Sequence, residues 1–164
     1  MNITNKNRVL AIDPGYERVG IAIIEKDEKG KELLVFSECF KTSAKINLHE
    51  RLEKIGMHVL EIIKKYHPNI LSIEKLYFTT NQKTVMGVSE ARGVIIFVAK
   101  TNHLEIFEYT PPQIKVAVTG YGKATKEMVM SMVPKLIKIG SDIKSDDELD
   151  AVAIGLTCFA CEKI

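Results

Sequence analysis

The feature that most constrains the fold is a series of short apolar runs near the N-terminus. Residues 8–13 read Arg-Val-Leu-Ala-Ile-Asp, and this run stops at Asp-Pro-Gly. Two similar runs follow over 19–24 and 33–40, with a charged segment between them. Apolar runs of this length, bounded by turn residues, predict buried strands. The charged segment predicts a hairpin loop, so we expect the first three strands to form an antiparallel meander.

Beyond residue 46 the pattern alternates between helix and strand. Apolar residues at helical spacing predict helices, and short apolar or alternating runs predict strands. This order implies an α/β fold: a mixed five-stranded sheet flanked by helices, with strands four and five separated by a helix. The expected elements are a helix over 47–66, a strand over 70–73, a helix over 82–102, a strand over 104–109 that ends at Pro111-Pro112, a helix from Thr125 to about Gly140, and a last helix from Ser145 to the end.

Composition favours one globular domain over residues 1–164. Hydrophobic residues make up 46% and charged residues 27%, which is enough apolar material for a core. The first residues are polar and lack the apolar segment of a secretory signal, and no apolar run approaches the roughly 18 residues that a membrane span needs. Three cysteines, Cys39, Cys158 and Cys161, cannot all pair within one chain. We therefore expect a cytoplasmic protein without membrane association.

Acidic residues stand at the ends of three core elements. Asp13 ends the first strand, Glu74 ends the fourth, and Asp146, Asp147 and Asp150 open the last helix. A carboxylate beside a buried strand costs desolvation free energy unless a charged or polar group pairs with it. Magnesium takes oxygen ligands and leaves positions for substrate phosphates, and two ions about 4 Å apart can support in-line attack on a phosphodiester. The pattern therefore indicates a shared divalent-cation site.

The first turn of the last helix leaves the choice of ligands open. At about 100° per residue, Asp147 and Asp150 share a face, but Asp146 and Asp150 are also close as i and i+4. Ser145 and Glu148 match a capping box, and acids in a first turn complement the helix dipole. Taken alone, this cluster is more typical of a cap than of a metal site. The combination with the two strand-end acids is what favours metal binding.

The formal net charge of +2 does not by itself indicate nucleic-acid binding. Its distribution is more informative, because a lysine-rich segment over 115–138 stands beside an acidic one over 141–150. Two solvated faces would explain the same pattern, so charge alone does not decide.

The start of the chain also allows another interpretation. Ile12-Asp13-Pro14-Gly15 followed by Gly20 resembles the first phosphate-binding hairpin of sugar kinases and actin-like ATPases. Those proteins need a second domain to close over the nucleotide, for which 164 residues leave no room. A Walker-type glycine loop is also missing from the sequence.

Four stretches together resemble the RuvC family of Holliday-junction resolvases, in order and spacing and over nearly the whole chain. The resemblance implies a ribonuclease-H-like fold and a homodimer that nicks two strands of a four-way DNA junction symmetrically in recombination and repair. It also implies the RuvA–RuvB branch-migration machinery as a partner. The stretches are Ala11-Ile12-Asp13-Pro14-Gly15; Ile73-Glu74 through Asn81 to Ala91-Arg92-Gly93; Tyr109-Thr110-Pro111 through Lys115, Gly120, Gly122 and Ala124 to Lys126; and residues 147–154.

The family pattern implies catalytic, metal-binding carboxylates at Asp13, Glu74, Asp147 and Asp150, and so selects Asp147 over Asp146. With it comes the expectation of magnesium, two ions per site, with manganese as a substitute.

The resemblance also implies DNA contacts. Lys115 and Lys126 match the family's DNA-contacting lysines, and Lys123 lies between them in the same basic segment. The segment after Glu74 is expected to reach into the opened junction, where Tyr77 or Phe78 could stack on an unpaired base at roughly 1–3 kcal/mol per base. The family more often has phenylalanine at the position of Tyr77. The alternatives are core packing for the aromatic pair and solvated surface for the lysines.

Two other functions fit a nuclease-like fold. One is a related enzyme that acts on RNA or RNA–DNA hybrids, which should read 2′-hydroxyls, and the sequence reveals no such contacts. The other is a catalytically silent junction-binding module, against which the presence of all four carboxylates argues. Arg92, in an apolar helix, is expected to have a structural role by pairing with a buried acceptor.

Overall fold

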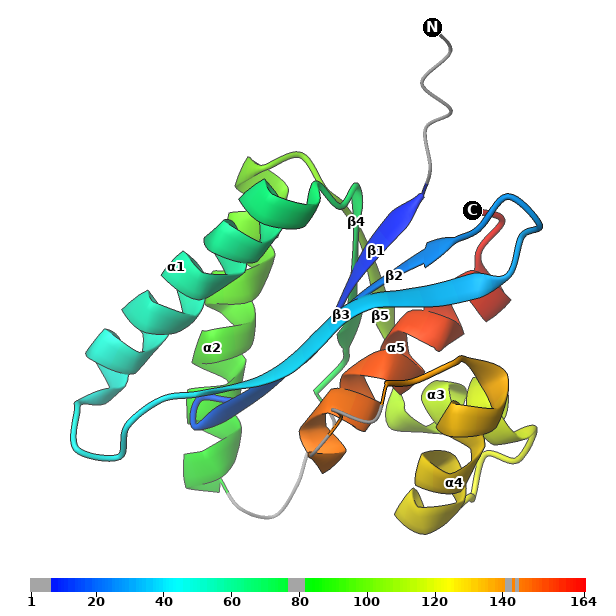
Figure 1. The fold of residues 1–164 in the computed structure, drawn as a ribbon. Coiled ribbons are helices and arrows are strands. Elements are labelled where there is room, and N and C mark those ends of the chain that lie inside the picture. Colours follow the sequence, from blue (N-terminus) through cyan, green and yellow to red (C-terminus); the bar gives the residue numbers. More distant parts are fainter. Residues whose placement is uncertain (1–6, 77–81, 141–142, 144) are drawn as a thin grey trace, which may run out of the picture.

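The computed structural model describes residues 7–76, 82–140, 143 and 145–164. Its centre is a five-stranded sheet with the strand order β3-β2-β1-β4-β5 (Figure 1). Strands β1 to β3 form an antiparallel meander, and β4 and β5 run parallel to β1. The predicted mixed sheet is therefore confirmed. The strands are β1 (Arg8–Asp13), β2 (Arg18–Lys26), β3 (Glu32–Lys41), β4 (Ile70–Glu74) and β5 (Glu105–Tyr109).

Helices cover both faces of the sheet (Figure 1). Helices α1 and α2 pack against each other on one face, and α3, α4 and α5 lie on the other. None of the helices within the described residues is long and apolar enough to cross a membrane. The helices are α1 (Leu48–Tyr66), α2 (Gln82–Thr101), α3 (Pro111–Thr119), α4 (Lys126–Leu136) and α5 (Asp146–Cys161).

The central strand β1 is buried on both sides, which explains its continuous apolar run. Successive side chains of a strand point to opposite faces of the sheet. Leu10 and Ile12 accordingly enter the core under α1 and α2, whereas Val9 and Ala11 enter the core under α5. A strand covered by helices on both faces needs no polar alternation. Its first polar position after this run is Asp13, at the edge of both cores.

Helix α3 was not among the elements expected from the sequence, which takes Pro111-Pro112 only as a stop for strand five. Thr110 is the N-cap of α3: its side chain accepts from the backbone N–H of Gln113, and the Gln113 side chain accepts from the backbone N–H of Thr110. Proline is tolerated in a first helical turn, where an N–H has no partner within the helix. Thr-Pro-Pro-Gln is therefore a helix start, with the prolines at its first two positions.

The end of α4 also differs from the expectation. The helix is capped by Thr125 as expected, but it ends at Leu136 and not near Gly140. Pro134 lies in its last turn and lacks the N–H that would bond one turn back. The chain then turns extended at Ile137, whose side chain is buried. Burial of Ile137 and the proline together stop the helix early.

Candidate metal and nucleic-acid site

Strand register brings Asp13 and Glu74 to the same edge of the sheet. Strands β1 and β4 are parallel neighbours, and Ile12 lies opposite Ile73. Each strand ends at the next residue, so the two half-buried carboxylates follow the paired isoleucines. The two strand-end acids predicted from the sequence are therefore brought together.

Close contact between α5 and β2 brings the helix carboxylates to this edge. Gly20 lies opposite Asp13 in the β1–β2 pair. A Cβ added at Gly20 would lie 2.0 Å from the backbone oxygen of Asp147, so the first turn of α5 rests directly on the glycine. Further along the helix, a Cβ at Gly155 would lie 2.6 Å from the side chain of Ile24. Two glycines thus let α5 approach the sheet closely at both points.

The carboxylates perturb one another. Burial raises the pKa of Asp13 to about 8, and the negative charges of Glu74, Asp150 and Asp147 add to the rise. The ammonium of Lys126 opposes it. Burial, and then the charge of Asp150, raises the pKa of Glu74 to about 7. A site in which burial and repulsion both disfavour ionised carboxylates favours the binding of a cation.

The structure separates Asp147 from Asp146, which helix spacing alone leaves unresolved. The side chain of Asp147 is 25% exposed, whereas that of Asp146 is 74% exposed. Asp147 Oδ2 accepts a hydrogen bond from Cys39 Sγ at 3.4 Å and lies 3.6 Å from the guanidinium of Arg18. Asp147 also belongs to the charges that act on Asp13. Asp147 is therefore the one that joins the carboxylate cluster.

Ser145 caps α5, as the sequence indicates, but the Glu148 side chain accepts from the hydroxyls of Ser145 and Ser37 and does not complete the expected capping box. The Ser145 hydroxyl accepts from the backbone N–H of Glu148 at 3.3 Å. The Glu148 carboxylate is buried and accepts a hydrogen bond from Ser37 of β3 at 2.8 Å. Glu148 therefore fixes the start of the helix on the sheet.

Two of the three predicted DNA-binding lysines line the site. Lys126 Nζ lies 3.2 Å from Asp150, and Lys115 and Lys126 join Glu74 and Asp150 around a cavity of about 140 Å³. Burial lowers the pKa of Lys126, but Asp150 and Asp146 together outweigh this effect and the pKa is raised overall. Lys123 is exposed on the loop before α4. The predicted Tyr77 and Phe78 lie outside the described residues.

Arg92 supports the end of β4. Its Nε donates to the backbone oxygen of Glu74 at 3.0 Å, and its guanidinium pairs with Glu108 of β5. Arg92 therefore has the acceptor that its expected structural role requires. That acceptor is the backbone oxygen of Glu74, a residue of the site. The contacts of Arg18 and Cys39 with Asp147 carry no signal in the sequence, since they depend on strand register and on the position of α5.

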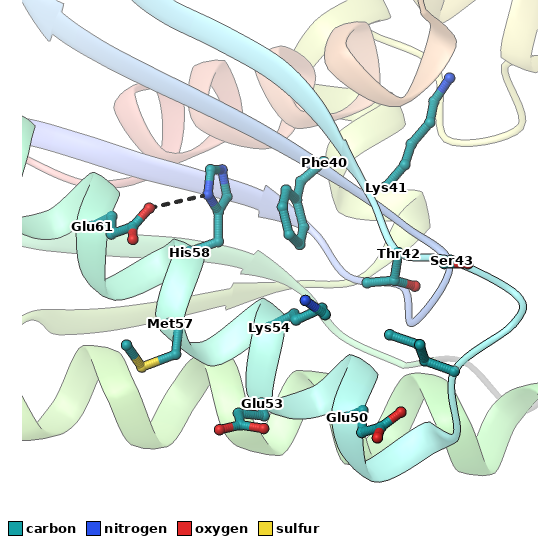
Figure 2. A pocket seen from close by; sticks show the side chains of 11 residues that line it. Phe40, Lys41, Thr42, Ser43, Glu50, Glu53, Lys54, Met57, His58 and Glu61 are labelled. Atoms are coloured by element: carbon teal, nitrogen blue, oxygen red, sulfur yellow. Dashed lines mark ion pairs between the residues drawn. The ribbon is translucent and has the colours of Figure 1, made fainter.

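A larger groove lies elsewhere among the described residues. Figure 2 shows this open groove of about 930 Å³ between α1 and the end of β3. Its charged side chains are of both signs, and His58 in it pairs with Glu38 and Glu61. Volume alone does not identify a site, so we place the candidate site at the carboxylate cluster, where burial and charge perturb the acids.

The donor set at the cluster suits a hard divalent cation. All four side chains offer carboxylate oxygens, which magnesium and manganese prefer. Within the described part of the chain, no three acidic, histidine or cysteine side chains are already arranged so that they could hold a metal ion. Positive charge is supplied at the cluster by Lys126 and Arg18.

Comparison with known proteins places the chain in a family. The family model described as crossover junction endodeoxyribonuclease RuvC matches residues 9–158. The chain belongs to the RuvC family. A RuvC of Fusobacterium nucleatum is 42% identical over 150 residues, which cover 92% of this chain and 78% of that protein. A RuvC of Alkaliphilus metalliredigens is 40% identical over 148 residues, or 90% of each chain.

The fold agrees with this assignment. The structure of Thermus thermophilus RuvC in complex with a Holliday junction substrate matches with a TM-score of 0.84 and 30% identity, over 92% of both chains. The yeast mitochondrial Holliday junction resolvase Ydc2 matches with a TM-score of 0.69 at 14% identity, which shows a shared fold. The resemblance drawn from sequence motifs is therefore confirmed.

Proposed function

We propose that this RuvC-family protein is a structure-specific endonuclease that resolves four-way DNA junctions by hydrolysing phosphodiester bonds. The observation that carries the proposal is the convergence of four carboxylates beside Lys115 and Lys126 on a RuvC fold. Related chains of about 40% identity are crossover junction endodeoxyribonucleases, and the Thermus thermophilus protein binds a Holliday junction substrate. Recombination and repair are the processes that such an activity serves.

In this proposal, Asp13 and Glu74 hold metal from the sheet edge, and Asp147 and Asp150 hold it from α5. RuvC-family nucleases depend on a metal ion. We assign magnesium, two ions per site, with manganese as a substitute, because the donor set is oxygen only. Bound metal supplies an activated water and neutralises charge that develops on the phosphate. The raised pKa values of Asp13 and Glu74 support this role, because burial and repulsion oppose their ionisation without a cation.

The lysines bind the DNA backbone next to the carboxylates. Lys126 and Lys115 line the cavity together with Glu74 and Asp150, and a phosphate there can replace Asp150 as the partner of Lys126. Lys123, exposed on the neighbouring loop, extends the basic surface. Tyr77 and Phe78 are assigned to stacking at the junction centre on the strength of the family pattern.

A homodimer provides the two active sites that symmetric nicks require. Met86 and Phe97 on α2 are 65% and 69% exposed, which is unusual for large apolar side chains. An isologous contact between two such helices, around a two-fold axis, would bury these two side chains. We therefore propose α2 as part of the dimer surface and the RuvA–RuvB machinery as a further partner.

The decisive experiment compares cleavage of a four-way DNA junction, a plain duplex and an RNA–DNA hybrid. Paired nicks in the junction with magnesium or manganese, and none in EDTA, are expected. Faster cleavage of the hybrid would contradict the proposal, as would full junction cleavage in EDTA. Binding without cleavage under every metal condition would indicate a silent binding module. Light scattering at micromolar concentration tests the dimer, and an active monomer would contradict it.

A further inference from the structure

A second group of positive charges lies on the other side of the carboxylate cluster, on β2 and β3. Arg18 begins β2 and lies directly opposite Lys41, which ends β3. Two like charges opposite each other across a strand pair destabilise the sheet unless an anion offsets them. Asp147 lies 3.6 Å from Arg18, whose side chain is 64% exposed. Much of the guanidinium is thus open to a further anion.

Lys41 belongs to the same face of the sheet as Arg18. Cys39 contacts Asp147 of α5, and Lys41, two residues on, therefore points to the α5 side. Phe40 between them packs on the opposite side with α1 and α2. In Figure 2 Lys41 stands at the rim of the groove, and its side chain extends in another direction than the ring of Phe40. The Lys41 ammonium also opposes the rise in the pKa of Cys39 that burial and Asp147 cause.

The backbone that carries this pair is held firmly. A Cβ added at Gly15 would lie 2.1 Å from the backbone oxygen of Arg18, so the loop between β1 and β2 turns tightly. The Thr42 hydroxyl donates to the backbone oxygen of Tyr16 at 2.6 Å, which ties the end of β3 to this loop. Tyr16 in turn packs against Gly87 of α2. These contacts therefore fix the backbone from which the side chains of Arg18 and Lys41 extend.

We propose that Arg18 and Lys41 form a second phosphate-binding arm, which holds the cleaved DNA strand on the side of the carboxylates opposite to Lys115 and Lys126. The inference rests on the proposed function. In the sheet, β2 and β3 lie on one side of Asp13, and β4, whose Glu74 lines a cavity with Lys115 and Lys126, lies on the other, so the two basic groups flank the cluster. A strand that crosses the cluster then meets positive charge before and after the scissile phosphate. Such contacts fix position and carry no sequence information.

The arm differs in a measurable way from simple neutralisation of Asp147. A phosphate contact releases counterions, so its loss lowers the slope of log affinity against log salt by about 0.9 for duplex DNA. Neutralisation of Asp147 would instead change the magnesium concentration needed for cleavage and leave the salt slope alone.

The test is gel-shift affinity for a four-way junction in EDTA, measured over a series of sodium chloride concentrations. The variant carries Arg18→Gln and Lys41→Gln together. Its slope should fall by about one to two units, and its affinity at 0.1 M salt should fall roughly tenfold per lost contact. Arg18→Lys, which keeps the charge, should retain most of the slope.

Matched controls remove positive charge elsewhere. Lys29 lies in the turn at the opposite end of β2 and β3, and Lys54 lines the groove of Figure 2; the controls are Lys29→Gln and Lys54→Gln. Both should leave the slope unchanged. An unchanged slope in the double variant, with or without a changed magnesium requirement, overturns the inference alone. A parent protein that does not bind the junction overturns the proposed function and this inference together.

Discussion

The two ends of the sheet differ in how their charged side chains are arranged. At the end where β1 begins, Arg8 pairs with Glu25 at 2.6 Å and donates to the backbone oxygen of Tyr66. Lys26 there donates to the backbone oxygen of Ile164 at 2.8 Å. At the end where β1 stops, burial raises the pKa of Asp13, with a further contribution from the neighbouring carboxylates.

The difference shows what each end does. Charges at the start of β1 are matched with partners and tie the strands, α1 and the C-terminal residues together. At the end of β1, buried carboxylates gather in greater number than a fold alone would favour, because unmatched buried charge costs stability. That excess is explained by a ligand that brings positive charge.

Removing a carboxylate from the cluster should give the largest effect. Asp13→Asn, Glu74→Gln, Asp147→Asn and Asp150→Asn should each lower single-turnover cleavage by about 10²–10³-fold or more, because metal and its activated water are lost. Junction affinity in EDTA should hold or rise slightly, since one repulsive charge is gone. Gel shifts and cleavage rates measure the two effects separately.

Asp146→Asn is the control, because Asp146 is 74% exposed and is not among the charges that raise the pKa of Asp13 or Glu74, although its carboxylate lies 3.6 Å from Lys126 Nζ. Its change should cost at most about 1 kcal/mol through the helix dipole and leave cleavage intact. If Asp146→Asn stopped cleavage while Asp147→Asn cleaved normally, our assignment on α5 would be wrong.

Gly20→Ala should give the next largest effect. The added Cβ would meet the backbone of Asp147, so the first turn of α5 must move. We expect unfolding to become easier by about 1–3 kcal/mol and cleavage to fall on the order of 10²-fold, because small displacements of reacting groups are costly. Thermal melting and single-turnover rates check both.

Gly155→Ala offers a comparison on the same helix, away from the cluster. Its Cβ would meet the end of the Ile24 side chain, which can move, and would lie 3.1 Å from the Cβ of Ala11, so α5 must shift by only a few tenths of an ångström. It should lower stability and leave the cleavage rate close to that of the parent. Equal losses of cleavage in both variants would show that α5 moves as a whole.

Two arginines, one at each end of the sheet, sharpen the comparison. Arg92→Met removes the hydrogen bond to the Glu74 backbone and should lower cleavage about tenfold and stability by about 1.5–3 kcal/mol. Arg8→Met removes similar bonds at the opposite end and should lower stability by a comparable amount while the folded protein cleaves at the parental rate. Chemical denaturation and single-turnover rates are the measurements. A normal rate in Arg92→Met would contradict its positioning role.

The last effect concerns pH and acts on stability alone. The folded-state pKa of Asp13 is about 8, above its ordinary value of 3.8. Its contribution to stability is therefore complete below about pH 4 and is lost as pH rises through about 8. In EDTA the melting temperature of the parent should fall by roughly 10 °C between pH 5 and 8.5, and Asp13→Asn should remove much of this fall. Glu25→Gln, at the opposite end of the sheet, should lower stability without flattening it. An unchanged pH slope in Asp13→Asn would disprove the effect.

Much of the fold follows from local pattern. Apolar runs predict β1, β2 and β4 because buried strands need apolar residues on both faces, alternation predicts β5, and the helix over 47–66 shows a clear apolar stripe. Helix α3 escaped prediction because proline is more familiar as a stop than as a first helical residue. The early end of α4 depends on burial of Ile137, which no local pattern reveals.

For the site, the sequence by itself determined where acids follow the core strands. Asp13 and Glu74 could be placed together because parallel neighbouring strands end at the same edge. Only the tertiary structure decided that Asp147 contacts Arg18 and Cys39, that Arg92 donates to the Glu74 backbone, and that Arg18 lies opposite Lys41. These contacts join distant residues, such as Cys39 and Asp147, 108 positions apart. They depend on strand register and on the close approach of α5 over Gly20, which local patterns do not encode.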